Sequence, residues 1–383
     1  MLAHDHANRT LGILSELAPP TKIVAYPGPT GPYLPRQGLP TIALSGSGPL
    51  FIFYAGVCQE LIDKGLLVPG VSKMAGISGG AIAAAVVAAG TPPLKLLDAY
   101  DAEGGIYCNA TLNEGWPMSR GGDFKGAAYD LKAFVANCVM TAQLPLEKLA
   151  KALRELLPAD VAAVSATVEV IASQINPINY KQRVAWPLGP FSSREDLIAK
   201  VGASSTLPCL ISGTAFIEVA GRPYVDGGYA ANFNQLCVNA TAANPCLSAS
   251  ALYYGTHGYL PQTNSHGMCD DSLPLAPPTG NSQPNPSDGF ASYPVLDRRD
   301  WKLGTKKCGL AAWAEAATSF FPFIDPSPGT TISINPGKRT PMPISPCQWH
   351  SYRLGWANRT ISRMIYEHGI GEARAFAAEE YGL

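Results

Sequence analysis

The chain has 383 residues, of which 46% are hydrophobic and 15% charged, so it can bury one large α/β domain or two modest ones and is not disordered. Its 28 basic and 29 acidic side chains nearly cancel. This balance argues against a nucleic acid partner and against an electrostatic attachment to anionic lipid, so any membrane contact would be apolar.

The first 37 residues are expected to form an irregular lead-in, because residues 17–40 are rich in proline and glycine. The start lacks the basic-then-apolar order of a secretory signal, and no segment approaches the length of a transmembrane helix. We therefore expect a soluble or peripheral protein. Four N-x-S/T sequons and five cysteines after residue 230 nevertheless indicate a secretory history, and the compartment stays open.

The first regular elements alternate between strand and helix. A short buried strand is predicted at Thr41–Leu44, a helix at Phe51–Lys64, a second strand at Val71–Ala75 and a second helix at Ala81–Ala89. Strand, turn and helix repeated in this order are typical of a parallel sheet with right-handed crossovers. The pattern predicts an α/β fold.

The elements that follow are predicted from periodicity and turn residues. Residues 257–300 are dense in proline, serine, asparagine and glycine and are interpreted as a surface insertion within a single domain spanning residues 38–383. Helices are predicted at 145–157, at 194–203 with Ser192 or Ser193 as its cap, and at 351–381. A strand is predicted at 162–171. A hairpin is predicted with strands at 215–219 and 224–225, joined by residues 220–223.

The segment Gly76-Ile77-Ser78-Gly79-Gly80 places a serine between glycines where a strand gives way to a helix. A turn this tight strains the backbone at its apex and exposes the serine oxygen at the edge of a sheet, as in a nucleophile elbow. The helix N-terminus that follows favours negative charge at the same point. The alternative is an ordinary helix cap with glycine neighbours.

The turn Gly46-Ser47-Gly48 also joins a strand to a helix, so its backbone amides could hold an oxyanion or a phosphate. A dinucleotide-binding loop would need glycine where Phe51 stands, and a P-loop would need a lysine that the segment lacks. An oxyanion site and an ordinary tight turn therefore remain.

A serine nucleophile needs a base, and Asp226 is the first candidate because it directly follows a short predicted strand. The alternative role for Asp226 is a turn aspartate beside Gly227 that bonds its own backbone. A histidine would be the base in a hydrolase with the order serine, aspartate, histidine. The candidates for that role are His257, His266, His350 and His368.

Four segments in this order resemble the patatin-like phospholipases: residues 46–48, 76–80, 203–208 (Ala-Ser-Ser-Thr-Leu-Pro) and 224–228 (Tyr-Val-Asp-Gly-Gly). The resemblance covers roughly residues 38 to 235. It implies a three-layer α/β/α fold with a mostly parallel central sheet, and a serine-aspartate dyad without histidine that hydrolyses lipid acyl esters. It also implies no metal and no other cofactor, and a lipid as the substrate.

Transferred to this sequence, the resemblance implies Ser78 as nucleophile and Asp226 as base. It further implies an oxyanion hole at Gly46, Ser47 and Gly48, with the Leu50 amide as a further candidate donor. The supporting glycines of the motifs are Gly76, Gly80, Gly227 and Gly228. The loop departs from the family's G-G-G-x-R/K-G pattern at Ser47, Leu50 and Phe51. Because the Phe51 ring could narrow the acyl site, a catalytically silent lipid-binding protein is the alternative from another functional class.

The nine cysteines include no C-x-x-C pair, which argues against a zinc site or a thioredoxin-type motif. Several are expected to be ordinary buried residues. The aromatic cluster at Phe320–Ile324 suggests a lipid-facing flap, with packing under a loop as the alternative. The oligomeric state cannot be predicted.

Overall fold

The computed structural model describes residues 40–101, 145–176, 179–207, 214–229, 237, 246–251, 331–352, 357 and 359–383. The chain divides into two compact units, Met1–Tyr33 and Leu34–Leu383, and every described residue belongs to the second. The predicted lead-in, the insertion at 257–300 and the aromatic cluster at 320–324 lie outside the described residues.

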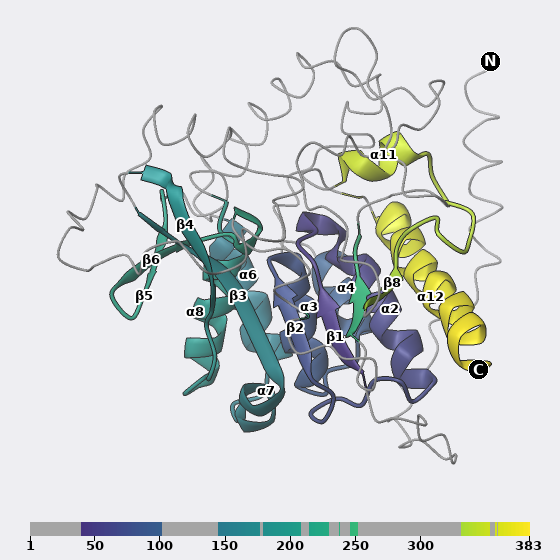
Figure 1. The fold of residues 1–383 in the computed structure, drawn as a ribbon, viewed down its shortest axis with the longest axis horizontal. Helices are drawn as coiled ribbons and strands as arrows, with labels where there is room; N and C mark the ends of the chain where they lie inside the picture. Colours follow the sequence, from purple (N-terminus) through teal and green to yellow (C-terminus); the bar gives the residue numbers. More distant parts are fainter. Residues whose placement is uncertain are drawn as a thin grey trace, which may run out of the picture. The chain divides into compact units, whose positions relative to one another are not determined.

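A single sheet runs through the described part of the chain (Figure 1). Its strands follow the order β5-β6-β3-β2-β1-β7-β8, and β4 also pairs with β3. All neighbours from β3 to β8 are parallel, whereas β4, β5 and β6 pair antiparallel. The strands are β1 (Thr41–Leu44), β2 (Met74–Ile77), β3 (Val168–Asn176), β4 (Asn179–Pro187), β5 (Ile217–Val219), β6 (Arg222–Val225), β7 (Cys246–Ala249) and β8 (Thr331–Ile334). The predicted three-layer α/β/α fold with a mostly parallel central sheet is confirmed.

Helices connect the parallel strands. Helix α2 (Phe51–Asp63) links β1 to β2, and α3 (Gly79–Ala88) follows β2 on the way to β3. Both crossovers step along the sheet in the same direction, so their helices share one face and contact each other. Every residue of α3 is buried. The other helices are α4 (Leu94–Asp101), α6 (Pro145–Leu156), α7 (Ala162–Thr167), α8 (Arg194–Ser204), α11 (Pro346–Ser351) and α12 (Arg359–Tyr381), with 3-10 turns η2 (Gly48–Leu50) and η5 (Gly227–Tyr229).

The second strand begins three residues later than predicted. Residues 68–72 form a turn in which the amides of Val71 and Ser72 both donate to the Val68 carbonyl, and the Ser72 hydroxyl accepts from the Val68 amide. The Val71 side chain is 62% exposed. The prediction of a strand at Val71–Ala75 was therefore wrong at its start, because the Pro69-Gly70 pair extends the turn into the apolar segment.

The predicted strand at 162–171 was wrong in its first half. Residues Ala162–Thr167 form α7, and β3 begins only at Val168. The helix starts where the Asp160 carboxylate accepts a hydrogen bond from the Ala162 amide, which satisfies one of the free amides of a helix N-terminus. Alanine favours helix over strand, and this local preference decided the first six residues.

The antiparallel edge confirms two local predictions. Helix α8 begins after Ser193, whose hydroxyl accepts from the Asp196 amide as a cap. Strands β5 and β6 form a hairpin whose turn is Ala220-Gly221, both with positive φ (50° and 73°). Two consecutive positive φ values are typical of a tight two-residue hairpin turn, so β6 begins two residues earlier than predicted. Strand β5 begins at Ile217, two residues later than predicted.

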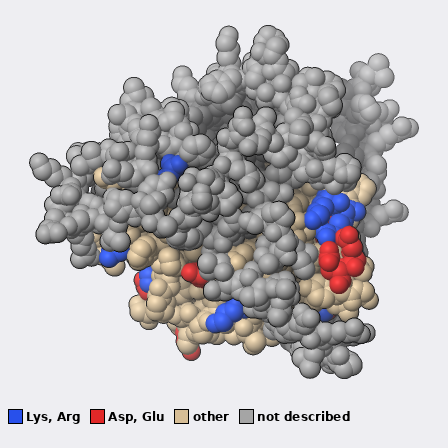
Figure 2. Space-filling model, in the orientation of Figure 1, with Lys and Arg blue, Asp and Glu red and all other residues tan. Residues whose placement is uncertain are grey.

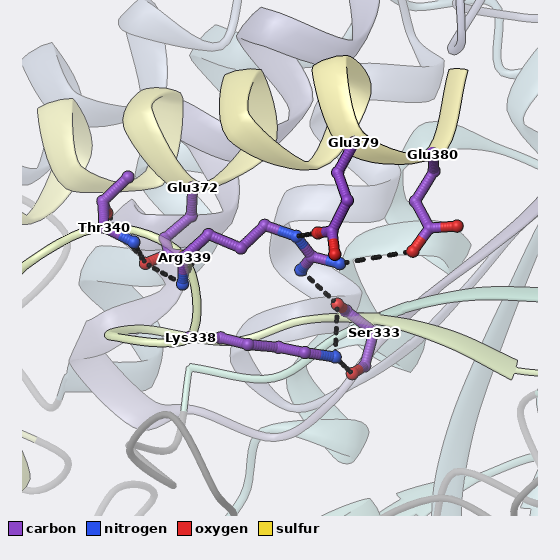
Figure 3. A network of polar contacts seen from close by, with 7 residues as sticks. All are labelled: Ser333, Lys338, Arg339, Thr340, Glu372, Glu379 and Glu380. Carbon is purple, nitrogen blue, oxygen red and sulfur yellow. Dashed lines mark hydrogen bonds and ion pairs between the residues drawn. The ribbon is translucent and has the colours of Figure 1, made fainter. Parts of the chain in front are cut away.

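The C-terminal helix α12 packs along α2 (Figure 1). Its Glu372 side chain is fully buried and accepts hydrogen bonds from the backbone amides of Arg339 and Thr340. Arg339 in turn pairs with Glu379 and Glu380 on the last turns of the helix (Figure 3). These contacts fasten α12 to the segment that follows β8. The helix begins at Arg359, later than the predicted start at residue 351.

Basic and acidic side chains pair with one another in the described chain, as Arg154 does with Glu195 and Lys200 with Asp196. On the face drawn in Figure 2, one blue and one red cluster of described residues lie side by side at the right. Among the helices of the described ranges, none combines the length and apolar character needed to cross a bilayer.

The cysteines divide into bonded and free ones. Cys237 and Cys246 form a disulfide with an S–S distance of 2.00 Å, and Cys347 is also disulfide-bonded. Cys58 is a free thiol buried in α2, as expected of an ordinary core cysteine.

Candidate active site

Ser78 stands at the apex of a strained turn. Strand β2 ends at Ile77 and α3 begins at Gly79, so Ser78 alone makes the reversal, with φ 53° and ψ −123°. A positive φ in a residue with a side chain costs about 1–3 kcal/mol and persists only where the surrounding structure imposes it. This is the conformation predicted for a serine on a nucleophile elbow.

The glycines around Ser78 allow this close packing. A Cβ atom on Gly80 would overlap the Leu44 carbonyl oxygen at the end of β1, and one on Gly76 would lie 2.6 Å from the backbone of Ala81. Both positions therefore require glycine. Because the turn rests directly on the end of β1, it also lies beside the loop that follows β1.

Asp226 reaches Ser78 through the register of β3. Strand β2 ends with Ile77 opposite Ile171, and β6 runs the other way and ends with Val225 opposite Ser173. Strand β4 pairs with all of Ile171–Asn176 on the other edge, so β2 and β6 share one edge of β3. Ser78 follows β2 and Asp226 follows β6. Both residues therefore lie beside Ala172 of β3, where the ends of the two strands face each other.

The two side chains interact electrostatically. Hydrogen bonding from Ser78 lowers the pKa of the Asp226 carboxylate, which is only 3% exposed. Burial raises the pKa of Asp226 to about 6, while the hydrogen bonds from Ser78 and from the Gly228 amide act in the opposite direction. No charged neighbour contributes to this shift among the described residues.

Asp226 is also the turn residue that the alternative interpretation expected. The Gly228 amide donates to its Oδ1 at 2.8 Å, so one carboxylate oxygen closes a local turn. A Cβ on Gly227 would overlap the Ile171 carbonyl oxygen, which explains glycine at that position. The two roles therefore coexist, since a carboxylate accepts several hydrogen bonds at once.

The loop after β1 lies against the residue that follows Ser78. A Cβ on Gly79 would overlap the Ser47 hydroxyl and would lie 2.7 Å from the Gly48 carbonyl oxygen. Within the described chain, the amides of Gly46, Ser47 and Gly48 donate no hydrogen bond. They are available to a ligand. The Leu50 amide, in contrast, is used within the 3-10 turn, where it donates to the Ser47 carbonyl at 3.3 Å.

Phe51, which departs from the family pattern, opens helix α2 and is fully buried. Its ring meets Tyr100 of α4 edge to face, with the ring centroids 5.9 Å apart. Its side chain is thus part of the core between two helices. A buried aromatic residue at the first position of α2 explains why the loop tolerates a large residue where glycine was expected.

His368 is the one candidate histidine whose side chain is described. It lies in α12, accepts a hydrogen bond from the Gly337 amide and packs against the rings of Phe53 and Trp349. Burial lowers its pKa to about 4. None of its contacts is with Ser78 or Asp226. The side chains of His257, His266 and His350 lie outside the described part.

No group of three or more His, Cys, Asp or Glu side chains within the described ranges is arranged to hold a metal ion. Two hollows lie on the described surface. One, of about 220 Å³, is lined mainly by apolar residues of α6 and α8, and the other, of about 270 Å³, surrounds Trp186 and Arg222. Neither is lined by Ser78 or Asp226, so we assign the substrate to neither.

Ser204 belongs to the segment 203–208 that resembles the family, but the sequence assigned no role to it. Its hydroxyl accepts a hydrogen bond from the Ser78 amide at 2.9 Å and donates to the Ile171 carbonyl at 2.6 Å. Two residues further on, the Thr206 carbonyl accepts a hydrogen bond of 2.8 Å from the Asp226 amide. The pattern of small polar residues after α8 was the signal, but only the fold shows which backbone groups they meet.

The model of the family described as "Patatin-like phospholipase" matches residues 42–236, which is half of the chain. The chain belongs to the patatin-like phospholipase family. The match includes Ser78, Asp226 and the loop after β1, and it ends before the described residues of β7, β8 and α12. A search of curated proteins finds no match for this chain.

Two solved structures are similar to this chain. VipD from Legionella pneumophila is 14% identical, with a TM-score of 0.34 over 88% of this chain and 66% of the VipD chain. A chain of the ExoU–SpcU heterodimer, from the type III secretion system of Pseudomonas aeruginosa, is 19% identical, with a TM-score of 0.25 over 55% of this chain and 43% of its own. At these TM-scores neither likeness bears on the site.

Proposed function

We propose that this protein hydrolyses fatty acyl esters of phospholipids or other glycerolipids, with Ser78 as nucleophile and Asp226 as base. Its family supports lipid hydrolysis at a general level. The observation that carries the finer proposal is the hydrogen bond from the Ser78 hydroxyl to a buried carboxylate whose pKa is raised to about 6. An aspartate with its ordinary pKa near 4 would be a weak base for a hydroxyl, and burial makes it a better one.

In the proposed reaction the Ser78 oxygen attacks the ester carbonyl as Asp226 accepts its proton. The alcohol leaves with that proton, and the acyl group remains on Ser78. A water molecule then attacks the acyl-enzyme and gives a proton to Asp226; the bond from the acyl carbon to the Ser78 oxygen breaks, the fatty acid leaves, and Asp226 returns the proton to Ser78. The proposed reaction requires no histidine, because the Asp226 carboxylate interacts with Ser78 without an intermediary.

The carbonyl oxygen becomes negatively charged in both steps. The unpaired amides of Ser47 and Gly48, with that of Gly46, would stabilise this charge, since the loop that carries them packs against Gly79 directly after the nucleophile. The N-terminus of α3 adds a favourable dipole at the same place.

A fluorophosphonate probe is expected to label the parent protein on Ser78. Peptide mass spectrometry would locate the adduct, and released fatty acid would be measured on a panel of phospholipids, galactolipids and triacylglycerols. Ser78→Ala should lose both labelling and release, whereas Ser205→Ala should keep both. Absence of labelling and of release in the folded parent would favour the alternative of a silent lipid-binding protein, and release that survives Ser78→Ala would disprove the role of Ser78.

Gly79→Ala is expected to lower kcat without removing Ser78. Because its new Cβ would overlap the Ser47 hydroxyl and crowd the Gly48 carbonyl, the loop must shift away from the nucleophile. Loss of one oxyanion donor lowers kcat by roughly 10²–10³-fold in serine hydrolases, and we expect a fall of about this size. Steady-state kinetics would measure it, with Gly371→Ala as control, since a Cβ there meets only ordinary contacts, the nearest at 3.8 Å. Parent-like kcat in Gly79→Ala would contradict an oxyanion role for the loop.

A further inference from the structure

The segment after α8 contacts both residues of the proposed dyad through their backbones. Ser204 is fully buried, and its hydroxyl makes two hydrogen bonds, accepting from the Ser78 amide and donating to the Ile171 carbonyl. The hydroxyl donates its single proton to the Ile171 carbonyl, and its oxygen accepts from the Ser78 amide. Ser204 thereby ties the apex of the strained turn to strand β3.

The Ser78 amide would otherwise have no partner. Ser78 lies outside both β2 and α3, and within the described chain its amide donates to no backbone carbonyl. Buried amides without partners are rare and unfavourable. The hydroxyl of Ser204 therefore supports the backbone conformation that directs the Ser78 side chain at Asp226.

The other end of the segment holds Asp226. The Thr206 carbonyl accepts from the Asp226 amide, and the Thr206 hydroxyl donates to the Gly202 carbonyl at 2.7 Å, which fixes the segment to the last turn of α8. The distance between the proposed nucleophile and base is thus set from one short stretch of chain.

We infer that Ser204 is a positioning residue, whose hydroxyl holds the Ser78 backbone so that the Ser78 side chain stays in hydrogen-bond contact with Asp226. The inference concerns geometry first, and its consequence for catalysis rests on the proposed function. Small displacements of a reacting group are costly, since a misplacement of about 1 Å can lower a rate by roughly 100-fold.

The hydrogen bond from Ser78 gives a measurable signature. That bond lowers the pKa of Asp226 against the opposing effect of burial. Removal of the Ser204 hydroxyl should let Ser78 move, weaken this bond and raise the pKa of Asp226 further. A residue that only fills space in the core would not change this pKa.

The matched control is the next residue. Ser205 is also buried, at 5% exposure, but its hydroxyl finds no hydrogen-bond partner in the described chain. Ser204→Ala and Ser205→Ala make the same chemical change at adjacent buried positions. Ser204→Cys is the second test variant, because it keeps a side chain of similar size with a much weaker donor and acceptor.

The experiment follows the Asp226 carboxyl carbon by NMR titration of the full chain, with the signal assigned by its loss in Asp226→Asn. Ser204→Ala and Ser204→Cys should each raise the pKa of Asp226, whereas Ser205→Ala should leave it at the parent value. On an ester substrate, Ser204→Ala should lower kcat by roughly 10- to 100-fold with little change in KM. Ser204→Cys carries the comparison if Ser204→Ala does not fold.

An unchanged pKa of Asp226 in a folded Ser204 variant would overturn the inference, as would an equal change in Ser205→Ala. Lower activity with an unchanged pKa would show a purely structural role and would overturn it as well. The titration needs no turnover, so it decides the position of Ser204 even if the parent hydrolyses no lipid. That last result would instead refute the proposed function.

Discussion

Asp226→Asn is expected to lower ester hydrolysis by about 10³-fold or more and, at neutral pH, to make the folded protein more stable. The amide cannot accept the Ser78 proton, so the base is lost. It keeps a carbonyl oxygen for the Gly228 amide, so the local turn remains. A gain in stability with loss of activity is what a buried functional charge predicts, because the fold bears the cost of desolvating it.

The pH dependence follows from the pKa of Asp226, which burial raises from 3.8 to about 6. Between these two pH values the folded state holds a proton on Asp226 that the unfolded chain releases. The contribution of the protonated carboxyl to the free energy of unfolding is fully present below pH 3.8 and is lost as the pH rises through about 6. At pH 7 the shift of about 2 units corresponds to at most about 3 kcal/mol of destabilisation, which Asp226→Asn should recover. Parent kcat/KM, in contrast, should fall as the pH drops below about 6.

Thermal unfolding and kinetics across pH 5–8 would measure both effects. Asp101→Asn is the matched control, because Asp101 also has a pKa raised by burial and also accepts a hydrogen bond from a serine, Ser362. Asp101 joins α4 to α12, and its replacement by asparagine should leave hydrolysis unchanged. If Asp226→Asn keeps most of the activity, the proposed dyad is wrong and a histidine base has to be considered again.

Gly369→Ala is expected to give the largest loss of stability among single substitutions in the C-terminal helix. Gly369 lies where α12 crosses α2, and a Cβ there would overlap the Phe53 carbonyl oxygen and lie 3.0 Å from the Val57 amide nitrogen. A Cβ on Gly56 of α2 would likewise overlap the Tyr366 carbonyl oxygen. Because backbone atoms cannot rotate away, the helices must separate, which should cost roughly 3 kcal/mol or more of the free energy of unfolding.

Gly371→Ala provides the comparison two residues along the same helix. Its Cβ would meet only the Thr340 side chain, at 3.8 Å, and alanine favours helix over glycine by about 1 kcal/mol. It should be neutral or stabilising in denaturant unfolding. The network that ties Arg339 and Thr340 to Glu372 is present in both variants, so it cannot explain a difference (Figure 3). Equal stability of the two variants would show that the helices do not pack through their backbones.

Several local elements could be predicted from neighbouring residues alone. Strand β1 and helix α6 were located to within a residue, and the cap of α8 was predicted because Ser193 and Asp196 interact within one turn. Two predictions failed where local signals conflicted. The apolar residues at 162–167 were interpreted as strand although alanine favours helix, and Val71 was placed in a strand although the turn before it continues through Ser72.

The residues of the candidate site differ in how far local sequence could predict them. The strained serine was visible in the sequence, because glycines and the change from strand to helix act within a few residues of Ser78. Asp226 was a candidate base because it follows a predicted strand, and the family resemblance implied the same role, but neither explained why it reaches Ser78. The antiparallel strand β6 lies on the same edge of β3 as β2, and no local pattern near Asp226 indicates that.

The sequence by itself determined the alternation of strands and helices, the turn that carries Ser78 and the family to which the chain belongs. Only the tertiary structure decided that Ser78 touches Asp226, that burial raises the pKa of this carboxylate and that Ser204 supports the Ser78 backbone across 126 residues of sequence. The physical reason is that turns and helices form from contacts between near neighbours, whereas strand pairing and desolvation depend on residues that meet only in the folded chain.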